Sequence, residues 1–146
     1  MPAPPKQTAP AAKPCTHCYA TLVLRTPDKR VFVMPSQTGS TTLPMAEVKE
    51  DHLPFLVALK ALEFFLKPSD SAACLEIGLR LIHEPISVFL NNGVREWQHI
   101  YILDLTESEA LGVGEFGMLM DLSTVEGSLQ HFVWNHASII KDALNG

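Results

Sequence analysis

One long apolar helix between β-rich segments constrains this chain more than any other feature. Residues 51–67 carry Pro54 in the first turn, where an amide hydrogen would lack a partner anyway, and Pro68 follows the last turn. Asp51 is a residue type that caps helices, so the helix is expected to begin there. After the first turn its polar residues are only Lys60, Glu63 and Lys67. Such a wide apolar face predicts a helix that is buried on nearly all sides.

Two β-rich runs precede the helix. YATLVLR (19–25) and RVFVMP (30–35) are separated by four turn-forming residues, a pattern that predicts a β-hairpin. A polar loop at 36–42 and a short extended segment at 43–48 follow the hairpin. The chain is therefore expected to enter the helix from a mainly antiparallel β-region.

Further β-segments follow the helix. Apolar residues alternate over 72–83, which predicts a half-buried strand. The turn signal NNG separates two more predicted strands, at 86–90 and 97–105. A short helical turn is expected at 106–111, and apolar residues that recur every three or four positions predict a closing amphipathic helix over 129–144. This element order indicates an α+β sandwich.

Composition and charge limit the class of protein. With 146 residues and 47% hydrophobic composition the chain can bury one core, expected to span 15–146 after a disordered Pro- and Ala-rich tail at 1–14. The net charge of -5 and the scattered basic residues give no patch for nucleic acid. No apolar run is long enough to cross a membrane, no secretory signal opens the chain, and three cysteines fit a reducing compartment, so a cytoplasmic protein is expected.

The element order and several local strings resemble the Nudix hydrolase family. LPMAEV (43–48) stands where that family has its Leu-Pro-Gly-Gly turn, ahead of a loop and helix that carry the Nudix box. The family spacing is G-x5-E-x7-R-E-U-x-E-E-x-G-U. Counted by this spacing, the characteristic positions of the box fall on Ala46, His52, Lys60, Ala61, Phe64 and Phe65.

Later segments extend the resemblance over most of residues 19–144. MLMDLSTVE (118–126) is similar to a strand and turn of many members, and VWNHASIIKDAL (133–144) is similar to a terminal-helix string of some ADP-ribose pyrophosphatases. The resemblance implies an α/β/α sandwich with a mixed, mostly antiparallel sheet. The same element order also fits a longin- or profilin-like domain, and the loop that enters the helix at 51–67 distinguishes these folds.

The helix residues put the family's chemistry in doubt. In active members, three glutamates on one face of this helix hold Mg²⁺ or Mn²⁺. Here Ala61, Phe64 and Phe65 share that face and supply no oxygen ligand, so no catalytic residue, metal or cofactor is expected from the box. Besides filling the core, the two phenylalanines could line the vacated pocket or form a patch for a protein partner.

Acidic residues elsewhere leave a hydrolase alternative open. Glu47 and Glu50 lie near the loop that enters the helix, and Glu115 lies in a later loop where some family members keep an extra catalytic acid. Together they could form a relocated Mg²⁺ or Mn²⁺ site. Acidic loops in an acidic chain are more often solvated surfaces, which is the favoured interpretation.

Other candidate sites carry weaker signals. The string C-x-H-C is formed by Cys15, His17 and Cys18 and could supply half of a zinc site. Because the sequence has no second cysteine pair to complete the site, ordinary cysteines are favoured. No H-E-x-x-H pattern or nucleophile elbow is present, and GVGEFG (112–117) matches neither phosphate-binding glycine pattern. His52 is expected to be solvated despite its box position.

Three functions remain open at this point. The first is a non-catalytic nucleotide-binding or protein-interaction module with a degenerate Nudix box. The second is a divergent hydrolase of a nucleoside-diphosphate-linked compound that uses relocated acids. The third is a structural subunit of a larger assembly. A nucleotide-like small molecule or a protein is the expected partner, and a homodimer is consistent with the sequence, but a fold alone does not choose among these functions.

Overall fold

A computed structural model of the chain describes residues 17–145. The predicted tail at 1–14, Cys15 and the last residue lie outside the described residues. Within 17–145, no helix combines the length and the apolar character that crossing a membrane requires.

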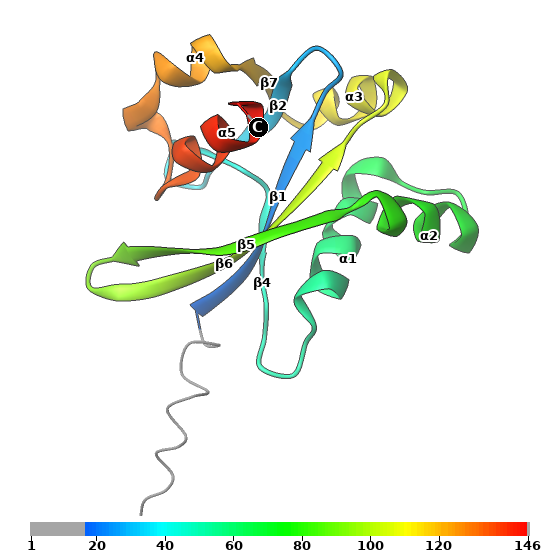
Figure 1. The fold of residues 1–146 in the computed structure, drawn as a ribbon, viewed down its shortest axis with the longest axis horizontal. Coiled ribbons are helices and arrows are strands. Elements are labelled where there is room, and N and C mark those ends of the chain that lie inside the picture. Colours follow the sequence, from blue (N-terminus) through cyan, green and yellow to red (C-terminus); the bar gives the residue numbers. More distant parts are fainter. Residues whose placement is uncertain (1–16, 146) are drawn as a thin grey trace, which may run out of the picture.

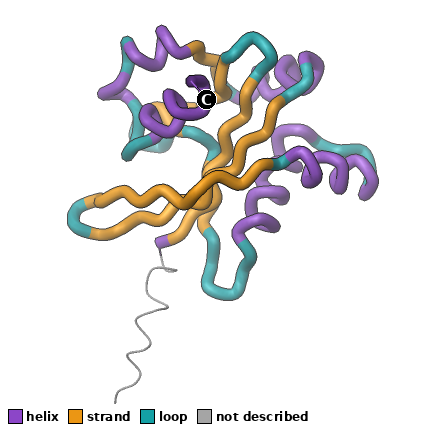
Figure 2. The backbone as a smooth tube through the Cα atoms, in the orientation of Figure 1, coloured by secondary structure: helices purple, strands orange, loops and turns teal. Residues whose placement is uncertain are grey.

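Strands and helices follow one another as shown in Figures 1 and 2. The strands are β1 (Cys18–Arg25), β2 (Arg30–Pro35), β3 (Thr41–Thr42), β4 (Met45–Glu47), β5 (Ile82–Asn91), β6 (Val94–Asp104) and β7 (Met118–Asp121). The helices are α1 (Pro54–Leu66), α2 (Ser71–Arg80), α3 (Glu107–Val113), α4 (Leu122–Glu126) and α5 (His136–Asn145), with 3-10 turns η2 (Gly114–Phe116) and η3 (Leu129–His131). The predicted hairpin of β1 and β2 and the predicted strands on either side of the NNG turn are present.

One mixed sheet organises the fold. Its strand order is β3-β2-β1-β6-β5, with β4 paired to β1 and β7 paired to β2. β1 and β6 run parallel from Cys18↔Trp97 to Arg25↔Asp104, whereas the other named strand pairs are antiparallel. The expected mixed, mostly antiparallel sheet is confirmed.

Two apolar cores separate the sheet from the helices on its two sides. Because side chains alternate along a strand, Leu22 and Leu24 of β1 join the core with Leu62 of α1, whereas Val23 joins the core with Ile140 of α5. In Figure 1, α1 and α2 lie to one side of the strands, and α4 and α5 lie to the other. Full burial of one aliphatic side chain contributes about 1.5–3 kcal/mol, so both layers stabilise the sheet. The α/β/α sandwich is therefore confirmed.

The prediction of a strand at 72–83 is wrong, because α2 occupies most of this segment. Asp70 caps the helix, and its carboxylate accepts a hydrogen bond from the Ala73 amide at 2.8 Å. The alternating apolar residues do not alternate in burial, since Ile77 is the one residue of α2 that is buried. The capping residue Asp70 therefore indicates the observed helix, whereas the alternation of apolar residues does not correspond to an alternation in burial.

The first helix begins later than predicted. Leu53 is the N-cap of α1 and makes no side-chain capping bond, whereas Asp51 lies in the preceding turn. Pro54 occupies the first helical turn as expected. The helix ends where Lys67 adopts a left-handed backbone with φ 49°, directly before Pro68.

The closing helix is shorter than predicted. It begins only at His136, although the apolar periodicity begins at residue 129. Trp134 has a left-handed backbone with φ 44°, which a continuous α-helix does not accommodate. The Val133 amide donates to the Thr41 carbonyl at 2.9 Å, so pairing with β3 takes the place of the first predicted helical turns.

Candidate functional site

The helix with the predicted box positions, α1, buries one face only. Ala58, Leu62 and Phe65 are its buried residues. Phe64 has 62% of its surface exposed, and Leu56 is also exposed. The prediction that this helix is buried on nearly all sides is therefore wrong, because the sheet covers it from one side and solvent reaches the other.

Phe64 and Phe65 belong to a cluster of four phenylalanines. The Phe65 ring centre lies 5.4 Å from that of Phe32 and 5.5 Å from that of Phe116, in edge-to-face contacts. The Phe64 ring centre lies 5.1 Å from Phe65 and 5.2 Å from Phe116. The Lys67 ammonium lies 5.2 Å from the centre of the Phe116 ring, within cation–π range. Hydrocarbon and an ammonium group thus make the contacts of this face, and neither is a ligand for a hard cation.

The remaining box positions lie on separate elements. Ala46 pairs with Ala20 in the ladder between β4 and β1. Lys60 is exposed on α1, and His52 is exposed in the turn before it, with its Nε2 3.7 Å from Asp51 Oδ1. The structure does not gather these side chains into a common site.

The acids considered for a relocated metal site are all exposed. Glu47 ends β4 opposite Tyr19, Glu50 lies in the turn before α1, and Glu115 lies in η2. Among residues 17–145, no group of three or more histidine, cysteine, aspartate or glutamate side chains is arranged to hold a metal ion. The structure therefore does not bring these three acids together into such a group.

The residues of the C-x-H-C string are only partly described, because Cys15 lies outside the described range. Cys18 is buried at the start of β1. His17 is exposed, and its Nδ1 lies 3.6 Å from Oε1 of Glu96, a buried oxygen that accepts no hydrogen bond from the described residues. The described part of the string thus contacts a carboxylate and forms no three-ligand group.

A chain of hydrogen-bonded polar side chains crosses the other side of the sheet. Gln98 Oε1 accepts hydrogen bonds from Thr21 Oγ1 at 3.0 Å and from His136 Nε2 at 2.9 Å. Gln98 Nε2 donates to Asn135 Oδ1 at 2.8 Å, and Asn135 Nδ2 donates to Ser87 Oγ at 2.7 Å. This polar network joins β1, β5 and β6 to the start of α5.

His136 is held in one neutral form within the polar network. The Leu43 amide donates to its Nδ1 at 3.0 Å, so Nδ1 carries no proton and the Nε2 hydrogen is donated to Gln98. Burial lowers the pKa of His136 to about 4. The imidazole is therefore neutral near pH 7 and connects α5 to the sheet.

A cleft of about 450 Å³ lies between α5 and the β5–β6 hairpin; we call it the α5 cleft. Its lining is mixed. Ile100, Ile102 and Ile139 are among its apolar residues, and Ser87 and Asn135 bring the end of the polar network into it. Its other polar lining residues are Arg25, Glu84, Ser138 and Asp142. A concavity that combines apolar walls with convergent polar groups is a common form of small-molecule site.

Arg25, which lines the α5 cleft, is already paired. Its Nε and Nη2 donate to the two carboxylate oxygens of Asp104 at 2.7 and 3.0 Å, and its Nη1 donates to the Ala143 carbonyl at 2.8 Å. These bonds tie the last turn of α5 to the sheet. Little capacity remains for a phosphate group, while Glu84 and Asp142 add negative charge to the lining.

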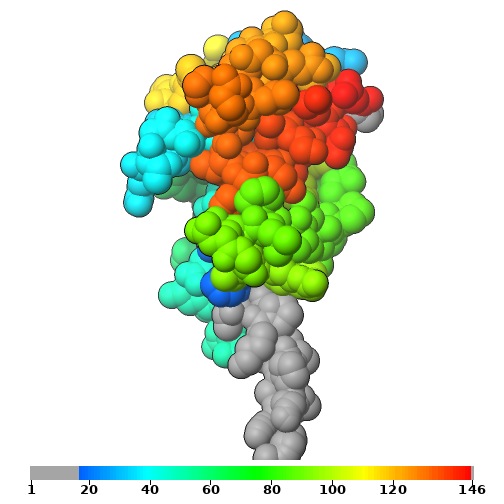
Figure 3. Space-filling view, turned by 90° about the vertical axis from the view of Figure 1, so that its left-hand side faces the viewer, coloured from blue at the N-terminus to red at the C-terminus, as the bar shows by residue number. Residues whose placement is uncertain are grey.

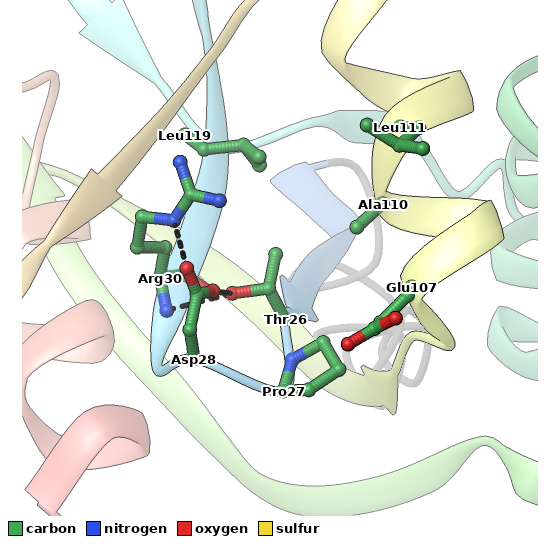
Figure 4. Close-up of a pocket in the computed structure, with 8 residues that line it drawn as sticks. All are labelled: Thr26, Pro27, Asp28, Arg30, Glu107, Ala110, Leu111 and Leu119. Atoms are coloured by element: carbon green, nitrogen blue, oxygen red, sulfur yellow. Dashed lines mark hydrogen bonds and ion pairs between the residues drawn. The ribbon is translucent and has the colours of Figure 1, made fainter.

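A second cavity, also of about 450 Å³, lies between the β1–β2 turn and α3 (Figure 4). Asp28 accepts hydrogen bonds from the Thr26 hydroxyl and, at 2.9 Å, from Arg30 Nε, and these bonds lower the pKa of the Asp28 carboxyl. Its polar groups come mostly from one turn, whereas polar side chains of β1, β5 and α5 converge on the α5 cleft, which is therefore the stronger candidate for ligand binding.

No motif in the sequence points to the residues of the polar network as a site. One signal for it exists at Thr21, a polar residue between apolar ones in β1, whereas Gln98 lies in a strand with several other polar residues. Both Thr21 and Gln98 are fully buried. A buried polar residue is more informative than a buried apolar one, since it requires a partner. That partner, at the start of α5, is too distant in sequence for a local pattern to indicate.

Solved structures of low sequence identity share this fold. A mutT/nudix family protein from Listeria innocua matches with a TM-score of 0.66 at 12% identity, over 88% of this chain and 92% of that chain. The Ap4A hydrolase of C. elegans gives a TM-score of 0.59 at 10% identity, over 88% and 92%. The NUDIX domain of Shewanella oneidensis NrtR complexed with ADP ribose gives 0.58 at 13% identity, over 88% and 86%.

The sequence itself has no comparable match, because no protein-family model and no curated protein matches it. At 10 to 13% identity, the likeness to these structures establishes the fold alone. The predicted Nudix-like fold is thereby confirmed.

Proposed function

We propose that this protein is a non-catalytic binding module with a Nudix-like fold and that its small-molecule ligand binds in the α5 cleft. The chemistry of α1 supports the proposed lack of catalysis, because Ala61, Phe64 and Phe65 stand at the positions that the family spacing assigns to the metal-binding glutamates. Mg²⁺ and Mn²⁺ need oxygen ligands, which these side chains lack. Since a metal ion neutralises the diphosphate and activates water in such hydrolysis, that reaction is not expected here.

The aromatic face of α1 is also held in place by packing. Phe65 is only 8% exposed and contacts Phe32 and Phe116. Turning its ring outward would expose apolar surface whose burial contributes about 1.5–3 kcal/mol. The cluster therefore supports the proposal that this face serves stability and does not bind a metal ion.

The lining of the α5 cleft suits the nucleoside part of a nucleotide-like molecule. Its isoleucines can bury a flat ring, and Asn135 and Ser87 can exchange hydrogen bonds with a base or a ribose. Glu84 and Asp142 can accept hydrogen bonds from hydroxyl or amino groups. Because Arg25 is already paired, a diphosphate should add little affinity. The NrtR domain complexed with ADP ribose supports this ligand class for the fold.

Thermal denaturation of the full chain in EDTA tests the binding proposal. Adenosine, AMP and ADP-ribose should each raise the Tm in a concentration-dependent way, by similar amounts, because a ligand that binds only the folded state stabilises it. Ser138→Trp should fill the cleft and abolish the shift. Ser123→Trp, at an exposed position on α4, is the matched control and should keep it. Absence of a shift with all three compounds would contradict the binding proposal.

Assays with metal test the non-catalytic assignment separately. We expect no Mn²⁺-dependent cleavage of ADP-ribose, NADH or Ap4A by the purified chain. The divergent-hydrolase alternative predicts turnover that disappears in Glu47→Gln, Glu50→Gln or Glu115→Gln. Turnover with that pattern would overturn the non-catalytic assignment, whatever the thermal shifts show.

A further inference from the structure

We propose that two copies of this chain pair through the outer edge of β5. This strand ends the sheet and pairs only with β6 among the described strands. An edge strand presents a row of unpaired backbone N–H and C=O groups, to which another strand can add. The interface is separate from the aromatic face of α1, whereas Ile86 and Ser87 at its start also line the α5 cleft.

Protection of this edge is confined to the first half of β5. Pro85 lacks an amide donor, and the pairing with β6 is irregular between Glu84 and Ser87. Proline and bulges are devices by which natural sheets prevent edge-to-edge association. The segment 86–91 contains neither a proline nor a charged residue, so its edge is unprotected.

The unprotected half also exposes apolar side chains. Ile86, Val88 and Leu90 are 45%, 43% and 62% exposed. Val88 pairs with Trp97 and Leu90 with Arg95, so the side chains of Val88 and Leu90 lie on the same face of the hairpin. Figure 3 shows the hairpin at the molecular surface, below the C-terminal helix. Branched apolar side chains beside a free backbone edge are what strand addition would bury.

A second copy of the same strand fits this edge. Antiparallel pairing about a two-fold axis at Val88 places the segment 86–90 opposite itself. With the axis at Val88, Ile86 of one copy faces Leu90 of the other, and apolar side chains meet across the new strand pair. No charged residue occurs from Pro85 to Val94, so self-pairing brings no like charges together.

The expected dimer is weak and reversible. A stable interface of standard size buries about 1,600 Å² in total. Two short edge segments bury less than that, although they complete each other's backbone hydrogen bonds. Monomer and dimer should therefore exchange as the protein concentration changes.

Sedimentation velocity of the full chain over a concentration series tests the proposal. The sedimentation coefficient should rise from the monomer value toward the dimer value. Val88→Lys should hold it at the monomer value, because it places two lysines opposite each other at the axis. Leu90→Lys should do the same, because it brings a charge against Ile86 of the other copy without a partner. Leu79→Lys, at a still more exposed position on α2, is the matched control and should leave association unchanged.

Amide hydrogen exchange of the unmodified chain covers the case in which a lysine variant fails to fold. Exchange at 86–91 should slow as concentration rises, whereas exchange in α2 should not. The proposal would be overturned if the wild-type chain stays monomeric or if exchange at 86–91 does not change with concentration. A dimer that persists in folded Leu90→Lys would also overturn it. A dimer dissolved by Phe64→Glu but not by Leu90→Lys would place the interface on α1 and would also overturn it.

Discussion

The two sides of the sheet are held in different ways. On the α1 side, the rings of Phe32, Phe64, Phe65 and Phe116 form a cluster of aromatic contacts. On the α5 side, Thr21, Gln98 and His136 meet through directed hydrogen bonds. Apolar contact is non-directional, whereas a buried polar chain requires each donor and acceptor to be in place. The arrangement of side chains on the α1 side is therefore set by apolar packing. On the α5 side it is set by the directions of hydrogen bonds.

The largest expected effect tests the packing on the α1 side. Phe65→Ala removes a buried ring and leaves a cavity, so the free energy of unfolding should fall by about 3–5 kcal/mol. Phe64→Ala is the matched control, and the exposed ring should cost about 1 kcal/mol or less. Urea denaturation measures both values. Equal losses would show that the two rings are packed alike in solution and would break the distinction between them.

A somewhat smaller effect comes from the pH dependence of the α5 side. Because the folded-state pKa of His136 is lowered to about 4 from 6.5, the unfolded chain takes up this proton between those values and the folded chain does not. The neutral imidazole therefore contributes fully to the free energy of unfolding above about pH 6.5. This contribution is lost as the pH falls toward 4, and the total loss is roughly 3 kcal/mol. In His136→Gln this part of the pH dependence should disappear. An NMR titration that places the His136 imidazole near 6.5 would contradict the expectation.

The smallest effect tests the coupling within the polar network. Gln98→Leu removes the acceptor for Thr21 and His136 and leaves two buried donors without a partner, each at a cost of about 1–3 kcal/mol, so the coupling to be recovered by removing one donor is about 1–3 kcal/mol. Adding Thr21→Val removes one of these donors and should recover part of the loss. A double-mutant cycle in urea measures the recovery. Strictly additive losses would show that the two side chains act independently and that the network is not a unit.

The fold was predictable where local signals and tertiary packing agree. The turn at Asn92 and Gly93 has φ 54° and 82°, as the NNG signal requires for a tight hairpin. α3 begins with a capping box in which Thr106 and Glu109 bond each other's backbone, and the sequence predicts a helical turn there. In α2 the signals conflict, because the apolar alternation indicates a strand and Asp70 caps a helix. The helix formed, because Asp70 caps its first turn and the apolar alternation is not used in burial.

The candidate site was not predictable from the sequence. The residue types at 61, 64 and 65 offer no oxygen ligand, and the absence of a metal site on α1 stays a prediction. The α5 cleft could not be predicted from the sequence, because its residues Arg25, Ser87 and Asn135 come from three distant segments. No local period relates such residues, and their contacts form only when the sheet and α5 pack together.

The sequence by itself determined which atoms the first helix can offer, because an alanine methyl group and phenyl rings contain no oxygen in any conformation. Only the tertiary structure decided that Phe65 packs inward while Phe64 stays exposed, and that Gln98 meets His136 across 38 residues of chain. Chemical identity is a property of single residues. Burial and hydrogen bonding are properties of pairs, and folding brings those pairs together.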